Sequence, residues 1–367
     1  MNVVVIGAGV IGAAVADALA VRGVRVTVID MRGPGRGATQ ASAGLLAPFI
    51  EAHDESPLLD LAVRSLDRYD AFIGGLRERS GCAIEYARTG TLEVALIEDE
   101  ADRLRAVERA IRGRGVATQW IESSAIRHVE PVVSDTAIAG LLTPAHGFVG
   151  VASLMKALLE SARMAGASFE QPVEAVRVDS SADRIDVTAG NRSYTADWVV
   201  VAAGSWSTRV RVTGTTMPVV RPIRGQLLHL AWMGPRPARS VWGAACYTVP
   251  WSDGSLLVGA TVEDVGFDEH STVAGVDSLT SAVRRLLPAS ARAAVEAVRV
   301  GLRPATPDGL PWIGPLSAAP RVVMAAGHYR NGVLLTPLTA DLVSRLIVDG
   351  ESDPALVVTS PNRTVGA

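Results

Sequence analysis

The strongest constraint on the fold lies at the N-terminus, where two apolar runs flank a glycine turn and a helical stretch within residues 3–30. Gly7, Gly9 and Gly12 have the G-x-G-x-x-G spacing, which permits a tight turn, a close pyrophosphate and close helix–sheet packing. Asp30 ends the second run at the distance expected for an acid that binds a ribose. The stretch therefore predicts a strand, a phosphate-binding turn, a helix and a second strand that bind a nucleotide.

The same stretch is compatible with two other interpretations. One is an unrelated βαβ unit whose small residues serve only packing. The other is a signal peptide or membrane helix, because residues 3–21 are almost continuously apolar. Against the second, no basic segment precedes the run, Asp17 interrupts it, and an alternating strand pattern soon follows.

Composition and charge narrow the class of protein. With 367 residues, 48% of them hydrophobic, the chain is long enough for two domains or one large interleaved unit. A net charge of −3 without a long basic run argues against nucleic acid as a partner. Cys82 and Cys246 are the only cysteines, so neither a disulfide framework nor a metal site is indicated, and a reducing cytoplasm fits. No further apolar run is long enough to span a bilayer.

A loop rich in small residues follows Asp30. Residues 41–48 (ASAGLLAP) are too apolar for a free surface loop, and their small side chains would let the backbone lie flat against a planar ligand. Arg32 and Arg36 are candidates for contacts with phosphate or with the adenine side, while solvated arginines are the alternative for both.

The rest of the chain alternates helical and strand patterns. Helical spacing of apolar residues predicts helices over residues 57–79, 98–113, 151–166, 275–299 and 331–350, the last capped by Asn331 and stopped by Gly350. Strand patterns cover residues 86–96, 137–142, 172–178, 184–190, 197–201, 222–232, 246–250, 255–260 and 321–328. Prolines and glycines predict that residues 301–316 lack regular structure.

One later strand belongs with the first glycine turn. The buried strand at residues 197–201 leads into a small-residue turn at residues 202–207. In a doubly wound fold this second turn lies beside the first. The nucleotide domain is therefore discontinuous, with the middle of the chain inserted into it.

Three motifs together indicate a family. They are VVVIGAGVIGAAVADALA at residues 3–20, RGATQASAGLLAP at residues 36–48, and GLRPATPDGLPWIG at residues 301–314 followed by AAGHYRNGVLLTP at residues 325–337. The chain resembles the D-amino-acid oxidase superfamily of FAD-dependent amine oxidases over nearly its whole length. Within it, the chain is most similar to the glycine oxidase branch, which serves thiamine biosynthesis.

The resemblance implies an α/β (α+β) fold with two domains. A discontinuous, Rossmann-like FAD-binding domain would comprise residues 1–80, 140–210 and 300–367. An interleaved antiparallel-sheet domain, residues 81–139 and 211–299, would cover the flavin and bind substrate. The resemblance also suggests a homo-oligomer, while the cytoplasmic location and the lack of a membrane segment are expectations from the cysteine usage and the apolar runs.

The resemblance also assigns site residues. Tyr247 and Arg303 match a pair that grips a substrate carboxylate, and Arg330 matches a residue whose backbone carbonyl takes the amine. The residues matched to the cofactor are Gly7, Gly9, Val10, Ile11, Gly12, Asp30, Met31, Arg32, Thr39, Gln40, Ala43, Gly44, Leu45, Val173, Ala203, Gly204, Trp206, Arg303, Tyr329, Arg330, Asn331, Gly332, Val333 and Leu334.

The implied reaction is the oxidative deamination of glycine, sarcosine or small D-amino acids. Hydride would leave the α-carbon for flavin N5, giving an imine, then an oxo acid plus ammonia or amine, with molecular oxygen reduced to hydrogen peroxide. Arg303 suits the carboxylate because guanidinium binds it bidentately. Since neither cysteine lies where some relatives attach flavin, we predict non-covalent FAD. His146 and His328 are not assigned catalytic roles.

Several alternatives remain at this point. The same fold can serve another amine, such as a secondary amine or a biosynthetic tailoring intermediate, as an oxidase or a dehydrogenase. Rivals are a NAD-linked dehydrogenase and a non-catalytic flavin- or nucleotide-binding protein. Two departures from the family pattern were noted. Residues 243–246 before Tyr247 are small and Val262 follows the next strand, which predicts a roomier, more apolar pocket, and residues 147–151 lack an expected proline.

Overall fold

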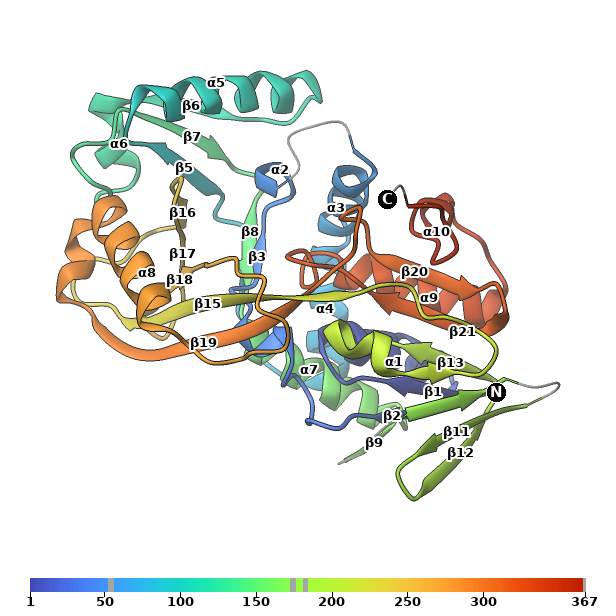
Figure 1. The fold of residues 1–367 in the computed structure, drawn as a ribbon. Coiled ribbons are helices and arrows are strands. Elements are labelled where there is room, and N and C mark those ends of the chain that lie inside the picture. Colours follow the sequence, from blue (N-terminus) through green and yellow to red (C-terminus); the bar gives the residue numbers. More distant parts are fainter. Residues whose placement is uncertain (52–55, 172–175, 181–183, 366–367) are drawn as a thin grey trace.

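The computed structural model describes residues 1–51, 56–171, 176–180 and 184–365. Val173, expected near the adenine, and the start of the strand expected at residues 172–178 lie outside the described residues. Figure 1 shows two halves, each built on a sheet, joined by the long strands β15 (Arg221–Ala231) and β19 (Ala294–Ala305).

A six-stranded sheet with the order β20-β21-β13-β1-β2-β9 carries the N-terminal glycine turn. Strands β1, β2, β9, β13 and β21 are parallel, whereas β20 joins the edge antiparallel. Their almost unbroken valine, isoleucine and alanine runs suit strands buried on both faces. The bounds are β1 Asn2–Ile6, β2 Arg25–Ile29, β9 Ser168–Glu170, β13 Trp198–Val201, β20 Trp312–Leu316 and β21 Ala319–Ala326.

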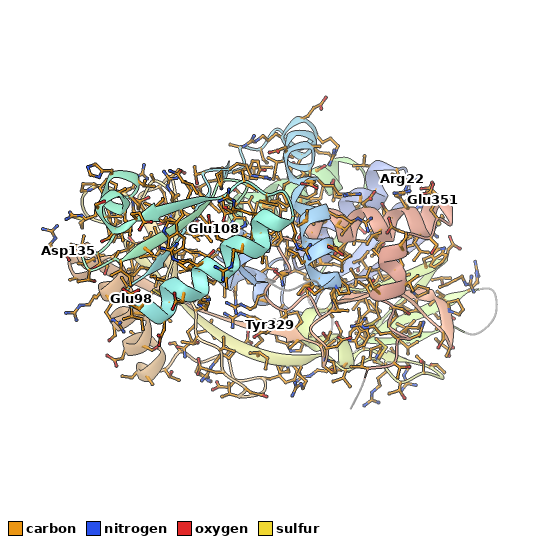
Figure 2. All side chains as sticks on the ribbon, turned by 90° about the horizontal axis from the view of Figure 1, so that it is seen from above. Arg22, Glu98, Glu108, Asp135, Tyr329 and Glu351 are labelled. Atoms are coloured by element: carbon orange, nitrogen blue, oxygen red, sulfur yellow. The ribbon has the colours of Figure 1, made fainter. Side chains whose placement is uncertain are left out.

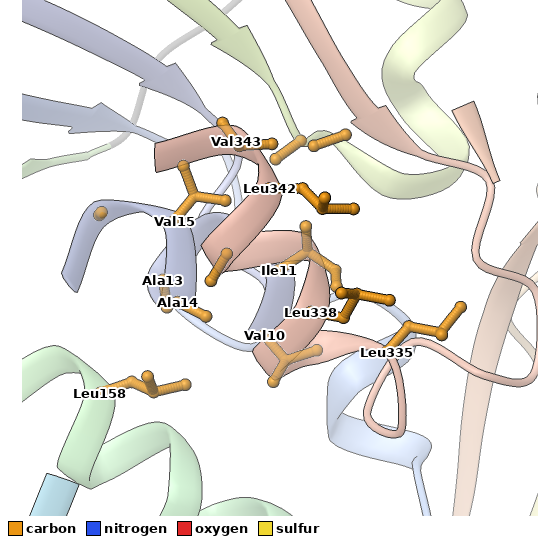
Figure 3. Packing of buried hydrophobic residues seen from close by; sticks show 14 of the residues in the cluster. Val10, Ile11, Ala13, Ala14, Val15, Leu158, Leu335, Leu338, Leu342 and Val343 are labelled. Atoms are coloured by element: carbon orange, nitrogen blue, oxygen red, sulfur yellow. The ribbon is translucent and has the colours of Figure 1, made fainter. Parts of the chain in front are cut away.

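Both faces of this sheet are covered. Helices α1 (Val10–Val21), α7 (Val151–Met164) and α9 (Thr336–Asp349) pack on one face through the cluster in Figure 3. A four-stranded sheet packs on the other, formed by β10 (Val176–Asp179), β11 (Ile185–Ala189), β12 (Arg192–Ala196) and β14 (Arg211–Val212). Small residues on α1 bring it close to the sheet, and a Cβ on Gly12 would lie 1.9 Å from the Gly7 carbonyl oxygen.

The second half is an eight-stranded sheet with the order β19-β15-β18-β17-β16-β5-β7-β6. Besides β15 and β19 its strands are β5 Thr91–Ala95, β6 Gln119–Glu122, β7 Ala139–Thr143, β16 Ser240–Trp242, β17 Tyr247–Pro250 and β18 Ser255–Gly259. Helices α5 (Glu98–Gly113), α6 (Ser123–Val129) and α8 (Val273–Leu286) cover it. Strands β7 and β19 run through the domain boundaries predicted at residues 140 and 300, and the division itself stays a prediction.

Shorter elements connect the halves. A small sheet joins β3 (Leu45–Leu46), β8 (Gly147–Val149) and β4 (Tyr86–Ala87). The remaining helices are α2 Pro48–Glu51, α3 Pro57–Leu66, α4 Tyr69–Ser80 and α10 Pro354–Val358, with 3-10 helices η1 Ala38–Ala41, η2 Gly204–Arg209 and η3 Pro288–Arg292. No helix in the described ranges is long and apolar enough to cross a membrane.

The single helix expected over residues 57–79 is wrong, because the chain forms α3 and α4 with a break between them. Ser65 Oγ donates to the Leu334 carbonyl at 2.7 Å, and the Tyr69 hydroxyl donates to the Val333 carbonyl at 2.5 Å. These tertiary bonds orient the two helices separately, which the shared apolar spacing did not reveal.

The helix expected over residues 275–299 is also wrong in its second part. Helix α8 ends at Leu286, Pro288 opens η3, and residues 294–299 are strand. The segment AVEAVRV contains three valines, which favour strand, and pairing with β15 satisfies its backbone.

Residues 301–316 are more regular than predicted. Gly301–Ala305 continue β19, and Trp312–Leu316 form β20. Pro304 is tolerated because it faces Pro222, which has no N–H either, and because its carbonyl accepts from Tyr329 N–H at 2.8 Å.

Two smaller corrections concern the site. Helix α9 begins at Thr336, so Asn331 is not its side-chain cap, although Gly350 ends it at φ +68° as expected. Residues 243–246 form the turn between β16 and β17 and are not part of the tyrosine strand.

Candidate functional site

A cavity of about 1030 Å³ lies where the carboxyl ends of β1 and β13 meet the eight-stranded sheet. This is the edge at which open α/β sheets bind ligands. Small-molecule pockets are typically about 300–1,000 Å³, so the cavity has room for a large, extended ligand.

The glycine turn forms one wall of the cavity. Gly7 has φ +108°, and a Cβ there would lie 2.4 Å from the Ala202 carbonyl oxygen, so only glycine fits. Asp30 accepts hydrogen bonds from the backbone N–H groups of Ala8 at 2.7 Å, Arg32 at 2.7 Å and Gly33 at 2.8 Å. Its carboxylate therefore holds the turn to the next loop while also lining the cavity.

The N-terminus of α1 points its backbone donors toward this wall. The Thr39 hydroxyl accepts from Val10 N–H at 3.1 Å. The N–H groups of Gly9, Ile11 and Gly12 donate to no group within the described part of the chain. Unpaired donors at the positive end of a helix dipole make this an anion site suited to a pyrophosphate.

A second wall is built from the small residues after β2. Gly44 has φ +73°, and a Cβ there would lie 1.8 Å from the Val149 carbonyl oxygen. Ala41, Ala43 and Ala47 line the cavity beside it, which gives the flat wall expected from the sequence. Arg36 is exposed and does not line the cavity.

A third wall comes from the segment between β21 and α9. Tyr329 has φ +49°, an uncommon conformation for a residue other than glycine. Figure 2 shows it near the middle of the molecule, with Asp135 and Glu98 toward one end and Arg22 and Glu351 toward the other. The N–H groups of residues 332–334 donate to nothing in the chain as described and face the cavity ahead of α9.

His328 also lines the cavity but is held in a neutral form. Its Nε2 lies 3.0 Å from Thr339 Oγ1, and burial lowers the pKa of the imidazole to about 3. His146 does not line the cavity, and burial with the Arg88 charge lowers its pKa to about 3. Neither histidine therefore exchanges a proton near neutral pH.

Tyr247 and Arg303 project from the eight-stranded sheet into the cavity. Each side chain lies over a glycine of the adjacent strand. A Cβ on Gly259, which faces Tyr247 across the ladder, would lie 2.5 Å from the tyrosine hydroxyl. A Cβ on Gly225 would lie 2.3 Å from Arg303 Cζ. The two glycines let both side chains lie flat on the sheet, and Arg303 Nη1 donates to the Thr261 carbonyl at 2.9 Å.

Sequence reasoning missed Trp242. It faces Tyr247 across β16 and β17, and their rings stack with centroids 4.7 Å apart and planes 23° apart. Trp242 lines the cavity. The small residues 243–246 were the available signal, because they suit a hairpin turn that places residues 242 and 247 opposite each other.

The cavity brings together most of the predicted site residues. Those that line it are Gly7, Gly9, Val10, Ile11, Asp30, Met31, Arg32, Thr39, Ala43, Gly44, Leu45, Ala203, Gly204, Trp206, Tyr247, Arg303, Tyr329, Arg330, Asn331, Gly332, Val333 and Leu334. Gly12 packs behind the turn, and Gln40 is exposed, so neither is among the lining residues. Lining residues not predicted include Ile29, Arg177, Thr188, Ser205, Arg209, Arg211 and Trp242.

Neither cysteine lines the cavity, and the described residues contain no candidate metal centre. Cys82 and Cys246 are unpaired and neither lines the cavity. Burial raises the pKa of the Cys246 thiol to about 12. Among the described residues, no group of three histidine, cysteine or acidic side chains is placed to hold a metal ion.

Comparison with known proteins gives consistent matches. The family model described as DAO, FAD dependent oxidoreductase, matches residues 2–346. Glycine oxidase of Geobacillus kaustophilus is 35% identical over 100% of this chain and 97% of its own length. The bifunctional protein ThiO/ThiG of Synechocystis is 32% identical over 99% of this chain, which spans 54% of that protein.

Solved structures agree with these matches. The crystal structure of glycine oxidase from Geobacillus kaustophilus superposes with a TM-score of 0.94, at 34% identity and 99% coverage of both chains. That of iminodiacetate oxidase from Chelativorans superposes with a TM-score of 0.90, at 26% identity and 98% coverage of both chains.

Proposed function

The chain belongs to the DAO family of FAD-dependent oxidoreductases, and we propose that it oxidises glycine, sarcosine or a small D-amino acid at the α-carbon. It is an FAD-dependent amino-acid oxidase, so the alternatives of a NAD-linked dehydrogenase and of a non-catalytic binding protein are set aside. The substrate, the use of oxygen as acceptor, a homo-oligomeric state and a cytoplasmic location are all predictions.

The cavity fits FAD on its own residues. The glycine turn and the unpaired donors of α1 suit the pyrophosphate, and Asp30 suits a ribose hydroxyl. The flat wall around Gly44 and the free N–H groups of residues 332–334 suit the ring system. When bound, FAD would accept the hydride, which carries the two electrons that the substrate amine loses.

The single observation that supports an amino acid as substrate is the pair Tyr247 and Arg303, held flat over Gly259 and Gly225. A planar guanidinium binds a carboxylate bidentately, and the tyrosine hydroxyl adds one donor. The Arg330 backbone carbonyl is the proposed acceptor for an amine N–H. Three contacts on one small molecule fix which α C–H faces the flat wall, and such alignment is the main contribution of the protein.

No side chain is proposed as a catalytic base. His328 is neutral and bonded to Thr339, so the amine needs only to arrive in its neutral form. Trp242 stacks on the Tyr247 ring and so helps to hold the tyrosine hydroxyl in place. The oxidised imine then hydrolyses in solvent.

One observation favours a second candidate, a secondary or bulkier amine. The Trp242 ring, stacked on Tyr247, gives the cavity an aromatic, largely apolar face beside the tyrosine. Similarity to iminodiacetate oxidase is in keeping with an N-substituted amino acid. Trp242→Ala should then change the preference between glycine and larger amines more than it changes FAD content.

The test mixes the purified protein anaerobically with glycine, sarcosine, D-alanine, D-proline, iminodiacetate and several L-amino acids while flavin absorbance is followed. Bleaching by glycine, sarcosine or a D-amino acid supports the proposal, and readmitted air tests oxygen as the acceptor. If only iminodiacetate or larger amines bleach it, the second candidate holds. The flavin of the Arg303→Met variant should be bleached by none of these compounds. Acid precipitation should leave FAD in the supernatant, as non-covalent binding predicts.

A further inference from the structure

One segment of the substrate half reaches the nucleotide end of the cavity. Residues 261–272, called here the strap, join β18 to α8. The strap contains no long helix or strand, and Gly266 turns it at φ +63°. Sequence analysis singled out only Val262 from this segment.

The base of the strap is fixed to β15 by a buried arginine. Arg224 is 4% exposed. Its Nη2 lies 2.5 Å from Glu263 Oε2 and its Nη1 lies 2.5 Å from Asp268 Oδ2. The backbones of Arg224 and Glu263 also exchange hydrogen bonds of 2.8 and 3.0 Å. Arg224 therefore fixes the strap at two points, at Glu263 near its start and at Asp268, which lies between Phe267 and Glu269.

A second buried side chain of β15 ties the two legs together. Gln226 is fully buried, and its Nε2 donates to Glu263 at 2.8 Å and to Thr272 Oγ1 at 3.0 Å. Its Oε1 accepts from Thr272 N–H at 2.9 Å. Both ends of the strap are therefore held in fixed positions on β15, and these positions determine where its tip lies.

The tip contacts the cofactor half. Glu269 Oε2 lies 2.9 Å from Arg32 Nη1, just after β2. The Phe267 ring lies 5.7 Å from the Trp206 ring. The Arg32 guanidinium lies 4.5 Å over Trp206, and that of Arg209 lies 3.9 Å over Phe267. Cation–π contacts thus bracket an aromatic pair whose two rings come from different halves.

Three members of this group, Arg32, Trp206 and Arg209, line the cavity. Asp30, Arg177, Thr188 and Arg211 line the same cavity. An adenosine diphosphate moiety carries the phosphate charge, ribose hydroxyls and aromatic ring that such residues bind. The strap residues Phe267 and Glu269 do not line the cavity and act through the residues they hold.

We propose that the strap retains the adenosine half of FAD by fixing Arg32, Trp206 and Arg209, with Phe267 and Glu269 as positioning residues for cofactor binding. This depends on FAD binding and not on which amine is the substrate. The strap comes from the substrate half, so residues of both halves together would retain the cofactor. The inference also explains why Phe267 is held at an aromatic contact although it is 38% exposed.

The test uses Glu269→Gln and Phe267→Leu, with Glu296→Gln as the matched control because Glu296 is on β19, 49% exposed at its side chain. Apoprotein is titrated with FAD, and release from the holoprotein is followed by the rise in flavin fluorescence. We expect each strap variant to raise the FAD dissociation constant and the release rate about tenfold, the change that a loss of about 1.4 kcal/mol gives. The control stays within twofold of wild type.

Further measurements separate positioning from general stability. The thermal midpoint of the apoprotein should be unchanged in both strap variants, because Arg224 and Gln226 still hold the base. Glu269→Asp should recover part of the affinity, and Glu269→Gln should have no effect on FAD release in an Arg32→Met background. The proposal would be overturned if both strap variants bound FAD as tightly as wild type does. It would also be overturned if the variants destabilised the apoprotein as much as they weakened FAD binding. Bleaching of the flavin by substrate in the holoenzyme should be the same whether or not the strap retains FAD. A failure of this proposal can therefore be distinguished from a failure of the proposed function.

Discussion

The cofactor wall of the cavity is made mainly of backbone, whereas the substrate wall is made of side chains that cross a sheet. Gly7 and Gly44 have positive φ, and a Cβ on either would meet a carbonyl oxygen of another strand or loop. Gly225 and Gly259 instead lie beneath Arg303 and Tyr247, where a Cβ would meet those side chains.

The difference teaches that glycine serves two purposes in one site. At the cofactor wall, glycine adopts a conformation and an approach that no other residue can, so replacement affects binding and folding together. At the substrate wall, glycine makes room for a functional side chain, so replacement moves that side chain. The predictions below test this distinction.

The largest effect is expected for Gly44→Ala. The new Cβ would lie 1.8 Å from the Val149 carbonyl oxygen at φ +73°, so the flat wall must shift. We expect a protein without bound FAD and a free energy of unfolding lower by about 4 kcal/mol or more. Flavin absorbance and urea denaturation measure both. Gly74→Ala in α4, which has open space around its Cβ, is the control, and equal losses in the two variants would refute the distinction.

The next effect is expected for Arg303→Lys. Lysine keeps the charge but loses the planar fork, so kcat/KM for the amino-acid substrate should fall about a thousandfold, or about 4 kcal/mol. FAD affinity should stay near that of wild type, because this residue acts on the substrate wall. Steady-state kinetics and FAD titration measure the two quantities. A variant that bound FAD poorly but turned over normally would place Arg303 on the cofactor wall instead.

A side chain in the substrate half should also make the free energy of unfolding depend on pH. Glu93 on β5 faces Trp242 and is 2% exposed, and its Oε1 has no hydrogen-bond partner among the described residues. Burial raises its pKa from 4.5 to about 7, against the lowering effect of the Arg103 charge. The folded protein therefore keeps this proton up to pH of about 7, whereas the unfolded chain releases it near 4.5.

The contribution of Glu93 to stability consequently falls as pH rises from about 4.5 to about 7, by an amount on the order of 3 kcal/mol. Glu93→Gln removes this loss. The free energy of unfolding of the variant, measured by urea denaturation, should therefore rise relative to that of wild type as pH rises through that window. Parallel pH profiles for the two proteins would mean that Glu93 titrates at its ordinary pKa.

The smallest effect is expected for Gly259→Ala. A Cβ 2.5 Å from the Tyr247 hydroxyl displaces the ring without removing it, so kcat/KM should fall about thirtyfold, or about 2 kcal/mol. FAD content should be retained. The double variant with Tyr247→Phe should lose no more than the single glycine variant, because both remove the same contact. Additive losses would mean that Gly259 acts by another route.

Much of the cofactor wall follows from local sequence. The glycine spacing around Gly7, the acid at Asp30, the small-residue loop around Gly44 and the stop at Gly350 are each recognisable within a short stretch of sequence, although the partners that Gly7 and Gly44 approach lie far away in the chain. Backbone conformation and helix starts are decided at that range, so a single sequence carries the signal. The expected NAD or FAD binding followed from the turn, and the family motifs pointed to FAD.

The tertiary structure alone decided how the substrate wall is assembled. Residues 294–299 formed a strand because β15, some seventy residues earlier in the chain, offered a ladder. Trp242 reached Tyr247, Gly259 came under that ring, and the strap met Arg32 only through strand pairing and contacts across the two halves. Such register has no local signal, because it depends on which distant backbones satisfy each other's hydrogen bonds once the core has formed.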